Sequence, residues 1–177
     1  MKFSNFSLLA LIAAAAFALN GCGTSSSSIT DTAAKSYLVE LPTPAGWARQ
    51  TNYPISAGVS ADFLLTGPVA DSASPNVLVI TSATSGIALD SAAKLQTRSM
   101  AKYVDFVLDS SKAIVAKGQS AWLIQARWTT NAGHPIIFRE IFFVYKSKDC
   151  QLAFTRGIGD SKNAATLLAL ESQIVLN

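Results

Sequence analysis

The sequence has one histidine, two cysteines and few charged residues, which make up 14% of its 177 positions. Its 11 Asp and Glu residues are spread singly, and no Asp-x-Asp-x-Asp-Gly loop occurs among them. A metal centre needs several converging carboxylates, imidazoles or thiolates, so we expect neither a metal nor another cofactor. A histidine mechanism would depend on His134, in the turn-like segment 131–135, and no Gly-x-Ser-x-Gly pattern supplies a nucleophile. We therefore expect His134 to be an exposed turn residue and assign no catalytic residue.

The charge balance also excludes several classes of protein. The 14 Lys and Arg residues exceed the acidic residues by three, and they are scattered along the chain. A domain that binds nucleic acid gathers its basic residues on one face, so nucleic acid is not an expected partner. No apolar run after the N-terminus is long enough to span a bilayer, which excludes a multi-pass membrane protein. With 50% hydrophobic residues, the chain should form one globular domain.

The N-terminus has the features of a bacterial export signal. A positive residue precedes the almost unbroken apolar segment 6–19, and small residues lead to Cys22. The junction Leu19-Asn20-Gly21-Cys22 resembles the lipobox, in which the cysteine is diacylated before cleavage. The resemblance implies a signal peptide over 1–21, cleavage between Gly21 and Cys22, and a lipid on Cys22. The alternative is a plain secretory signal with an incidental cysteine.

Lipidation would make the membrane the first partner of the protein. One acyl chain holds a protein only reversibly, whereas the three chains implied by the lipoprotein resemblance make release negligible. Gly23 follows the cysteine, where an Asp tends to retain a lipoprotein in the inner membrane. By analogy we expect a lipid-anchored protein of the bacterial cell envelope, on the outer membrane and facing the periplasm. Residues 22–35 are rich in Ser and Thr, have no hydrophobic period, and predict a flexible tether.

The second cysteine lies far from the first. With Cys22 committed to a lipid, Cys150 has no partner in the chain for a disulfide, although the compartment is oxidising. Cys150 shares its strand phase with Leu152 and Phe154, so we predict a thiol buried in the core. A reactive or cross-linking thiol is the alternative.

Residues 36–177 predict a single α+β domain with the order βββαββββα. Alternating apolar residues bounded by turn residues predict strands at 37–41, 61–66, 76–82, 112–117, 121–130, 136–146 and 150–156. The first three could pair as a meander, and short turns make the last four consecutive antiparallel strands. Apolar residues fall on both phases of 136–145, so we place this strand near the centre of the sheet with both faces covered.

Two helices should flank this antiparallel sheet of about six to seven strands. Asp90 can cap a helix that runs to about Phe106, because apolar residues recur there at helical spacing. Asp160 can cap a final helix over 161–175. The preceding Gly157-Ile158-Gly159-Asp160 lacks the spacing of a phosphate-binding loop, and a strand-to-helix turn explains it.

Several local patterns carry a family resemblance. They are the Leu41-Pro42 and Gly46-Trp47 opening, the strand entry Pro75-Asn76-Val77, the central helix, and the long hairpin before a C-terminal helix. In this order the chain resembles the PsbP-like superfamily, in particular the bacterial DcrB-type lipoproteins, over about residues 36 to 177. The resemblance implies an antiparallel sheet used as a binding or scaffolding surface, with no active site common to the family.

Two groups of residues are candidates for binding a partner. Lys94, Arg98 and Lys102 are spaced four apart, so they would stack along one helix face and could meet an acidic partner or a lipid headgroup. The alternative is a solvated helix face on which Asp90 pairs with Lys94. Trp122 and Trp128 share one phase of a strand, where they would pack in the core or form an exposed aromatic shelf for a peptide or glycan.

The function that these features favour is a non-enzymatic envelope lipoprotein that binds or scaffolds another envelope component. A periplasmic carrier of a small ligand or metal ion, with a pocket between sheet and helix, is the alternative. An enzyme is disfavoured because no nucleophile or metal cluster is evident in the sequence.

Overall fold

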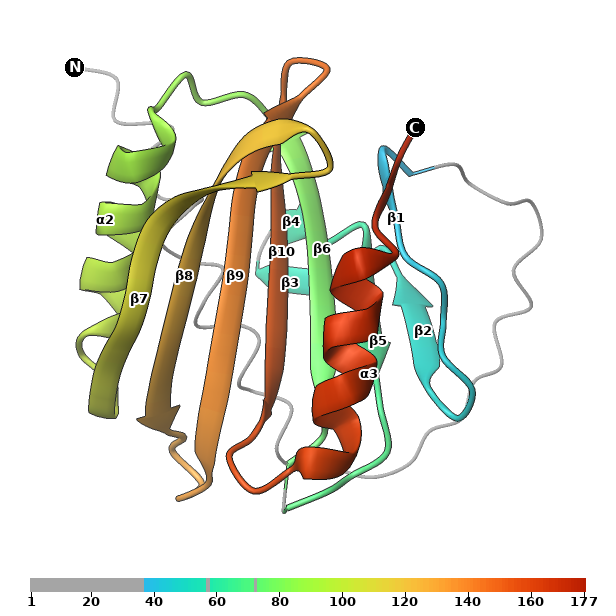
Figure 1. The fold of residues 1–177 in the computed structure, drawn as a ribbon, viewed down its shortest axis with the longest axis vertical. Helices are drawn as coiled ribbons and strands as arrows, with labels where there is room; N and C mark the ends of the chain where they lie inside the picture. Colours follow the sequence, from blue (N-terminus) through green and yellow to red (C-terminus); the bar gives the residue numbers. More distant parts are fainter. Residues whose placement is uncertain (1–36, 57, 72) are drawn as a thin grey trace.

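The structure is a computed structural model that describes residues 37–56, 58–71 and 73–177. The expected signal peptide (1–21), the tether (22–35) and Cys22 lie outside the described residues. Over the described residues, a seven-stranded antiparallel sheet carries two helices, one on each face (Figure 1). The expected α+β fold class is confirmed.

Eleven strands and two helices make up the described part of the chain. The strands are β1 (Val39–Glu40), β2 (Ala48–Thr51), β3 (Pro54–Ser56), β4 (Val59–Ser60), β5 (Phe63–Thr66), β6 (Asn76–Ala83), β7 (Val104–Ala116), β8 (Gln119–Thr129), β9 (Pro135–Tyr145), β10 (Lys148–Gly157) and β11 (Val175–Leu176). The helices are α2 (Leu89–Met100) and α3 (Ser161–Ser172).

The strand order in the large sheet is β2-β5-β6-β10-β9-β8-β7. The four strands β7 to β10 follow one another as antiparallel neighbours, as the short turns predicted. Left-handed residues make two of these turns tight: Lys117 and Gly118 between β7 and β8, and Lys146 and Ser147 between β9 and β10. Strand β10 takes the centre of the sheet and β9 lies beside it, which confirms the prediction that 136–146 is near the centre.

Alternation along the strands builds two separate cores. In β10, for example, Cys150, Leu152 and Phe154 face α3, whereas Ala153 faces α2. The core under α3 includes Val39, Phe63, Val77, Val79, Leu123, Ile141, Phe143, Leu167 and Leu170. The core under α2 includes Leu64, Leu78, Ile80, Ala93, Met100, Ile124, Trp128, Ile136, Phe138 and Phe142. The central strands are therefore buried on both faces.

The central helix is shorter than the sequence predicted. It ends at Met100 rather than near Phe106, and β7 begins at Val104, well before the predicted strand at 112–117. Tyr103 and Phe106 lie beyond the end of the helix and still pack against the core under α2. The apolar spacing therefore extends past Met100, which is why the sequence predicted a longer helix. Asp90 was also wrongly predicted as the cap: the N-cap is Ala88, with no side-chain hydrogen bond.

The ends of the domain also differ from the prediction. The first strand pairs with β11 instead of joining a meander, and β2 takes its place beside β5. Strands β2, β3 and β4 were missed because they are short and largely exposed, so they lack a clear alternation of apolar residues. The final helix does begin after the Asp160 cap, whose carboxylate accepts from the Asn163 amide, but it ends at Ser172 to leave room for β11.

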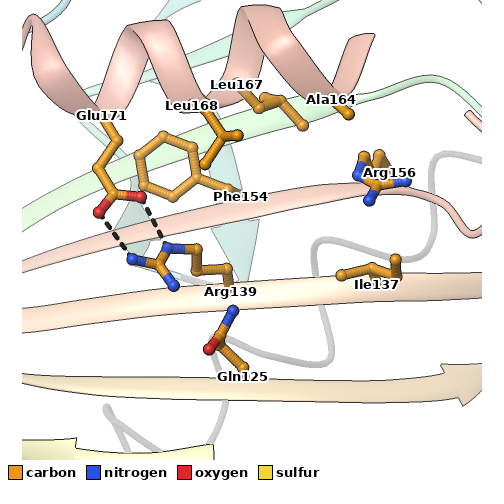
Figure 2. Close-up of a pocket in the computed structure, with 9 residues that line it drawn as sticks. All are labelled: Gln125, Ile137, Arg139, Phe154, Arg156, Ala164, Leu167, Leu168 and Glu171. Atoms are coloured by element: carbon orange, nitrogen blue, oxygen red, sulfur yellow. Dashed lines mark hydrogen bonds and ion pairs between the residues drawn. The ribbon is translucent and has the colours of Figure 1, made fainter. Parts of the chain in front are cut away.

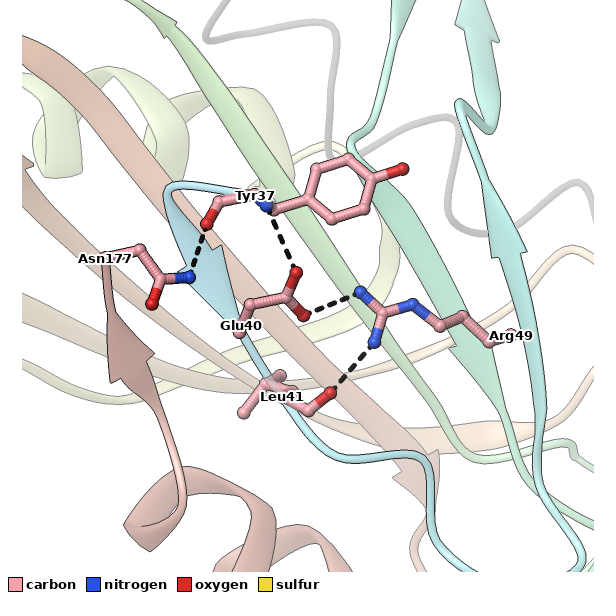
Figure 3. A network of polar contacts seen from close by, with 5 residues as sticks. All are labelled: Tyr37, Glu40, Leu41, Arg49 and Asn177. Atoms are coloured by element: carbon pink, nitrogen blue, oxygen red, sulfur yellow. Dashed lines mark hydrogen bonds and ion pairs between the residues drawn. The ribbon is translucent and has the colours of Figure 1, made fainter. Parts of the chain in front are cut away.

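A polar clasp ties the two ends of the described chain together (Figure 3). The Asn177 side chain donates to the Tyr37 carbonyl at 2.7 Å, and the Tyr37 amide donates to Glu40 at 3.1 Å. Arg49 then pairs with Glu40 at 2.9 Å and donates to the Leu41 carbonyl at 2.9 Å. The first described residue is thus held by both the C-terminal residue and the sheet.

A buried carboxyl lies between the sheet and α2. Glu140, on β9, is fully buried and accepts a hydrogen bond from the side-chain amide of Gln151 on β10. Gln96, also fully buried, approaches it from α2. Burial raises the pKa of Glu140 to about 8, and the amides of Gln151 and Gln96 oppose this rise only in part. The carboxyl is therefore neutral over most of the range below that pH.

We predict that Glu140→Gln removes a pH dependence of stability. The folded-state pKa of Glu140 is above its unfolded value of 4.5, so its contribution to the free energy of unfolding is complete below that value and is lost as the pH rises towards about 8. At about 1.4 kcal/mol per pKa unit, the loss is on the order of a few kcal/mol. Urea unfolding at pH 5 and pH 8 should show it in the wild type and not in Glu140→Gln. Glu171→Gln, at a partly exposed glutamate, is the control. An equal change in the free energy of unfolding between pH 5 and pH 8 in all three proteins would contradict the prediction.

The thiol of Cys150 is buried, as predicted, with 1% of the residue exposed. Burial raises the pKa of this thiol to about 12, so it carries no thiolate at neutral pH. Its strand places it opposite Phe143 on one side and Thr81 on the other.

We predict that Cys150→Ser lowers the free energy of unfolding by about 1–3 kcal/mol, because a hydroxyl replaces a thiol in an apolar core. Cys150→Ala, which keeps the site apolar, should cost less. Urea denaturation of the three proteins measures the difference. Unchanged stability of Cys150→Ser, together with the loss of a disulfide-linked dimer present in the wild type, would show that the thiol is accessible.

Candidate functional site

A groove runs between α3 and the adjoining face of the sheet (Figure 2). Its volume is about 130 Å³, and strands β8, β9 and β10 form one wall while α3 forms the other. The residues that line it are Gln125, Ile137, Arg139, Phe154, Arg156, Ala164, Leu167, Leu168 and Glu171.

The sheet wall follows from the register of β9 and β10. Arg139 lies opposite Phe154, and Ile137 lies opposite Arg156. Because paired residues share a face and every second residue of a strand returns to it, each arginine neighbours an apolar side chain and the two arginines are diagonal neighbours. The sheet therefore offers the groove an alternating pattern of guanidinium and apolar groups.

The helix wall follows from the period of α3. Ala164, Leu167, Leu168 and Glu171 are spaced by three, four and seven residues, which places them on one stripe. Leu167 is buried in the core, whereas Leu168 is 64% exposed at the rim of the groove. The groove thus has an apolar side chain accessible from solvent.

Two arginines and one glutamate set the charge of the groove at +1. Arg139 donates through Nε and Nη2 to the two carboxylate oxygens of Glu171, at 2.7 and 2.8 Å, with each side chain about a quarter exposed. This bidentate pair joins β9 to α3. Arg156 has a different environment, since its Nη1 donates to the backbone carbonyls of Gly157, Ile158 and Asp160 at 3.0 to 3.2 Å.

The hairpin between β7 and β8 reaches over to α3 at one end of this face (Figure 1). Lys117, at the hairpin tip, donates to the carbonyl of Ser172 in the last turn of α3 at 2.6 Å. The β7–β8 hairpin therefore contacts the C-terminal end of α3.

The chemical groups that line the groove can form hydrogen bonds, ion pairs and apolar contacts. Its polar groups are guanidinium, amide and an ion-paired carboxylate, and its floor is apolar. A volume of about 130 Å³ is well below the roughly 300–1,000 Å³ of sites that enclose a small-molecule ligand. It is large enough for about four water molecules, or for one side chain of a partner protein.

The predicted basic stripe lies on the other side of the sheet. Lys94 is exposed and forms the expected i,i+4 ion pair with Asp90 at 3.0 Å. Arg98 is exposed in the last turn of α2, and Lys102 is exposed beyond the helix end, so the three residues do not share one helix. The pairing of Lys94 with Asp90 is the solvated-face alternative that the sequence left open.

The predicted tryptophan pair faces α2. Trp128 is 2% exposed and stacks on Tyr103 with ring centres 5.2 Å apart. Trp122 is half-buried, packs against the same core, and donates its indole N–H to Ser111 at 2.9 Å. An exposed aromatic shelf is therefore wrong for Trp128, and core packing is the arrangement that the structure contains.

The remaining sequence candidates take structural positions. His134 is a turn residue between β8 and β9, as expected, but it is partly buried and not exposed, and its amide donates to the Thr130 hydroxyl at 3.1 Å. The turn at Gly157 to Gly159 is filled by the carboxylate of Asp71, which accepts from the Gly159 amide at 2.6 Å. Within residues 37–56, 58–71 and 73–177, no three His, Cys, Asp or Glu residues gather closely enough to hold a metal. In the same residues, no helix has the length and apolar character that crossing a membrane requires.

A pocket between sheet and helix was expected only under the carrier alternative, and none of the residues that line the groove was predicted from the sequence. Two signals were present: Arg139 interrupts an apolar strand, and Glu171 follows the leucines of α3 at helical spacing. Neither signal identifies a site alone, because the ion pair that joins them spans 32 residues and depends on the packing of α3 on the sheet.

The fold is similar to those of three solved structures. LpqN, described as involved in cell envelope biogenesis of Mycobacterium tuberculosis, matches with a TM-score of 0.59 and 17% identity over 78% of this chain and 83% of that one. The cyanobacterial PsbP protein CyanoP of Synechocystis matches with a TM-score of 0.54 and 14% identity, over 79% and 87% of the two chains. A Pseudomonas aeruginosa protein of unknown function matches with a TM-score of 0.50 and 18% identity, over 62% and 78%. No protein-family model matches the sequence, and no curated protein does. The expected PsbP-like fold is therefore confirmed at the level of the fold.

Proposed function

We propose that this protein is a lipid-anchored component of the bacterial cell envelope that acts as a non-enzymatic binding module for another envelope protein. The observation that carries the proposal is the groove beside α3, which the exposed Leu168 lines together with Arg139 and Arg156. Apolar area rimmed by arginine is typical of surfaces that bind proteins. The fold shared with LpqN, a protein described as involved in cell envelope biogenesis, supports the same compartment.

A carrier of small molecules is the weaker alternative. A carrier must enclose most of its ligand, and the volume of the groove holds only a few non-hydrogen atoms. A protein partner needs no enclosure, because one of its side chains can enter the groove while the rest contacts the surrounding surface.

The lipid places the groove at a membrane surface. We propose that Cys22 is diacylated and that residues 22–35 tether the domain to the outer membrane on its periplasmic side. The basic residues Lys94, Arg98 and Lys102 remain a second candidate surface, since they lie on the face opposite the groove and Arg98 and Lys102 are exposed.

We predict that Cys22→Ser, expressed behind a cleavable secretory signal in place of residues 1–21, converts the membrane-bound protein into a soluble one. Without a thiol the acyl chains cannot attach, and the domain loses the apolar anchor. Fractionation of cells expressing each form, with mass spectrometry of the N-terminal peptide, measures the change. An unmodified N-terminal peptide in the wild type would contradict lipidation, and Cys150→Ser, which leaves the N-terminus intact, is the control.

We predict that Leu168→Asp abolishes capture of the partner in cells. A carboxylate at the rim would have to be desolvated when a partner covers it. In-cell crosslinking with mass spectrometry should recover an envelope protein from the wild type and from Val115→Asp, an equally polar change at a residue 76% exposed elsewhere.

The same experiment separates the two surfaces. Joint replacement of Lys94, Arg98 and Lys102 by Glu should leave capture intact if the groove is the docking surface. If that variant loses the partner and Leu168→Asp keeps it, the surface on α2 is the functional one and the groove is not.

A further inference from the structure

Arg156 differs from the other arginines of the sheet in what its guanidinium contacts. Arg127 holds Asp109 through Nε and Nη2 at 2.8 to 3.0 Å, and Arg139 holds Glu171 through the same two nitrogens. In Arg156 the contacts to the protein run through Nη1. Within the part of the chain that the structure describes, its Nε and Nη2 have no hydrogen-bonding partner.

The hydrogen bonds of Nη1 hold the whole guanidinium of Arg156 in place, including its Nε–Nη2 edge. Three carbonyl oxygens around Nη1, those of Gly157, Ile158 and Asp160, fix the plane of the guanidinium. The Nε–Nη2 edge presents two parallel N–H groups, which match the two oxygens of a carboxylate. A carboxylate that bound there would therefore meet donors whose orientation is already determined.

Two carboxylates lie beside the turn that follows Arg156, and both accept hydrogen bonds from other donors. Asp160 accepts from the Asn163 amide and from its side chain, both at 2.9 Å. Asp71 accepts from the Gly159 amide at 2.6 Å. Among the described residues, neither carboxylate neutralises Arg156, and this arginine accounts for the net charge of +1 in the groove.

Apolar side chains line the same groove as this guanidinium. Ile137 lies opposite Arg156 in the register, and on α3 Ala164 lies nearest to Arg156 while the exposed Leu168 lies one turn further towards Glu171 (Figure 2). Ile158, whose carbonyl accepts from Arg156, is 43% exposed. A ligand that used only its carboxylate would leave this apolar surface uncovered, whereas a protein segment can use both.

We propose that the groove binds a segment of a partner protein that places an Asp or Glu side chain on the Nε–Nη2 edge of Arg156 and a neighbouring large apolar side chain against Ile137 and Leu168. This inference rests on the proposed function, because it specifies the chemistry of the partner at the same groove. It commits to an acidic side chain within a chain, and not to a free carboxylate metabolite.

A displayed peptide library tests the proposal. Random 12-residue peptides, fused so that they have no free C-terminal carboxylate, are selected against the purified full-length chain in detergent. The enriched sequences should place Asp or Glu within about three residues of Leu, Ile, Val or Phe. At that separation an extended peptide can bring its acidic side chain to Arg156 and its apolar side chain to the apolar residues of the same groove. One enriched peptide is then labelled with fluorescein for affinity measurements.

We expect Arg156→Gln to weaken that peptide at least tenfold, as loss of a charge-assisted bidentate pair should. Replacing the acidic residue of the peptide by its amide should cost as much in the wild type and nothing further in Arg156→Gln. The substitution in the peptide leaves the protein unaltered. It therefore tests the contact between the peptide carboxylate and Arg156 even if Arg156→Gln disturbs the turn whose carbonyls bind Nη1 of Arg156. Arg127→Gln, an arginine already paired with Asp109, should bind the peptide as the wild type does.

The outcomes separate this inference from the proposed function. Binding that is lost in Leu168→Asp but shows no acidic preference and no effect of Arg156→Gln would overturn the inference and leave the groove as the docking surface. Failure to enrich any peptide whose binding depends on Leu168 would overturn both. Equal binding of free acetate-sized carboxylates and of the peptide would show that the guanidinium acts without the apolar contact, which also contradicts the proposal.

Discussion

Strand β10 lies at the centre of the seven-stranded sheet and is buried on both faces, so the other elements must cover each face with apolar side chains. A sheet has two faces, and β10 places apolar side chains on both: Leu152 and Phe154 on one, Ala153 on the other. Exposing them to water would cost about 25 cal/mol of stability per Å² of apolar surface. This requirement places α2 and α3 on opposite faces. It also explains why the chain returns at both ends, since β1 and β11 complete the cover beside α3.

The groove is a consequence of how far one helix can reach. Helix α3 has 12 residues and is about 18 Å long, whereas β8 and β9 have 11 residues each and are about 37 Å long. A helix of that length covers only part of the strands beneath it, and the uncovered boundary is where Ile137, Arg139 and Leu168 meet solvent. The ion pair between Arg139 and Glu171 links β9 to α3 across this boundary, and both side chains remain partly exposed.

The sequence predicted those features that depend on local pattern. The four consecutive strands, the final helix with its Asp160 cap and the buried Cys150 all follow from alternation and turn chemistry within a few residues. It could not predict the pairing of β1 with β11 or of Arg139 with Glu171, because each joins segments that only the folded sheet brings together. The central helix was extended too far for a related reason: Phe106 contacts the same core from a strand that helical spacing alone does not distinguish.

Two neighbouring residues of β9 show how the groove depends on the core. Arg139 points into the groove, where it is partly exposed and Glu171 balances its charge, and Glu140 points into the core, where it is neutral because burial raises its pKa to about 8. A slip of the strand by one residue would exchange these positions. A buried carboxyl can lose its charge by protonation, but a guanidinium cannot, so the slipped register would bury an uncompensated cation at a cost of several kcal/mol. The register that fills the core under α2 is therefore the one that places the arginine of β9 beside α3.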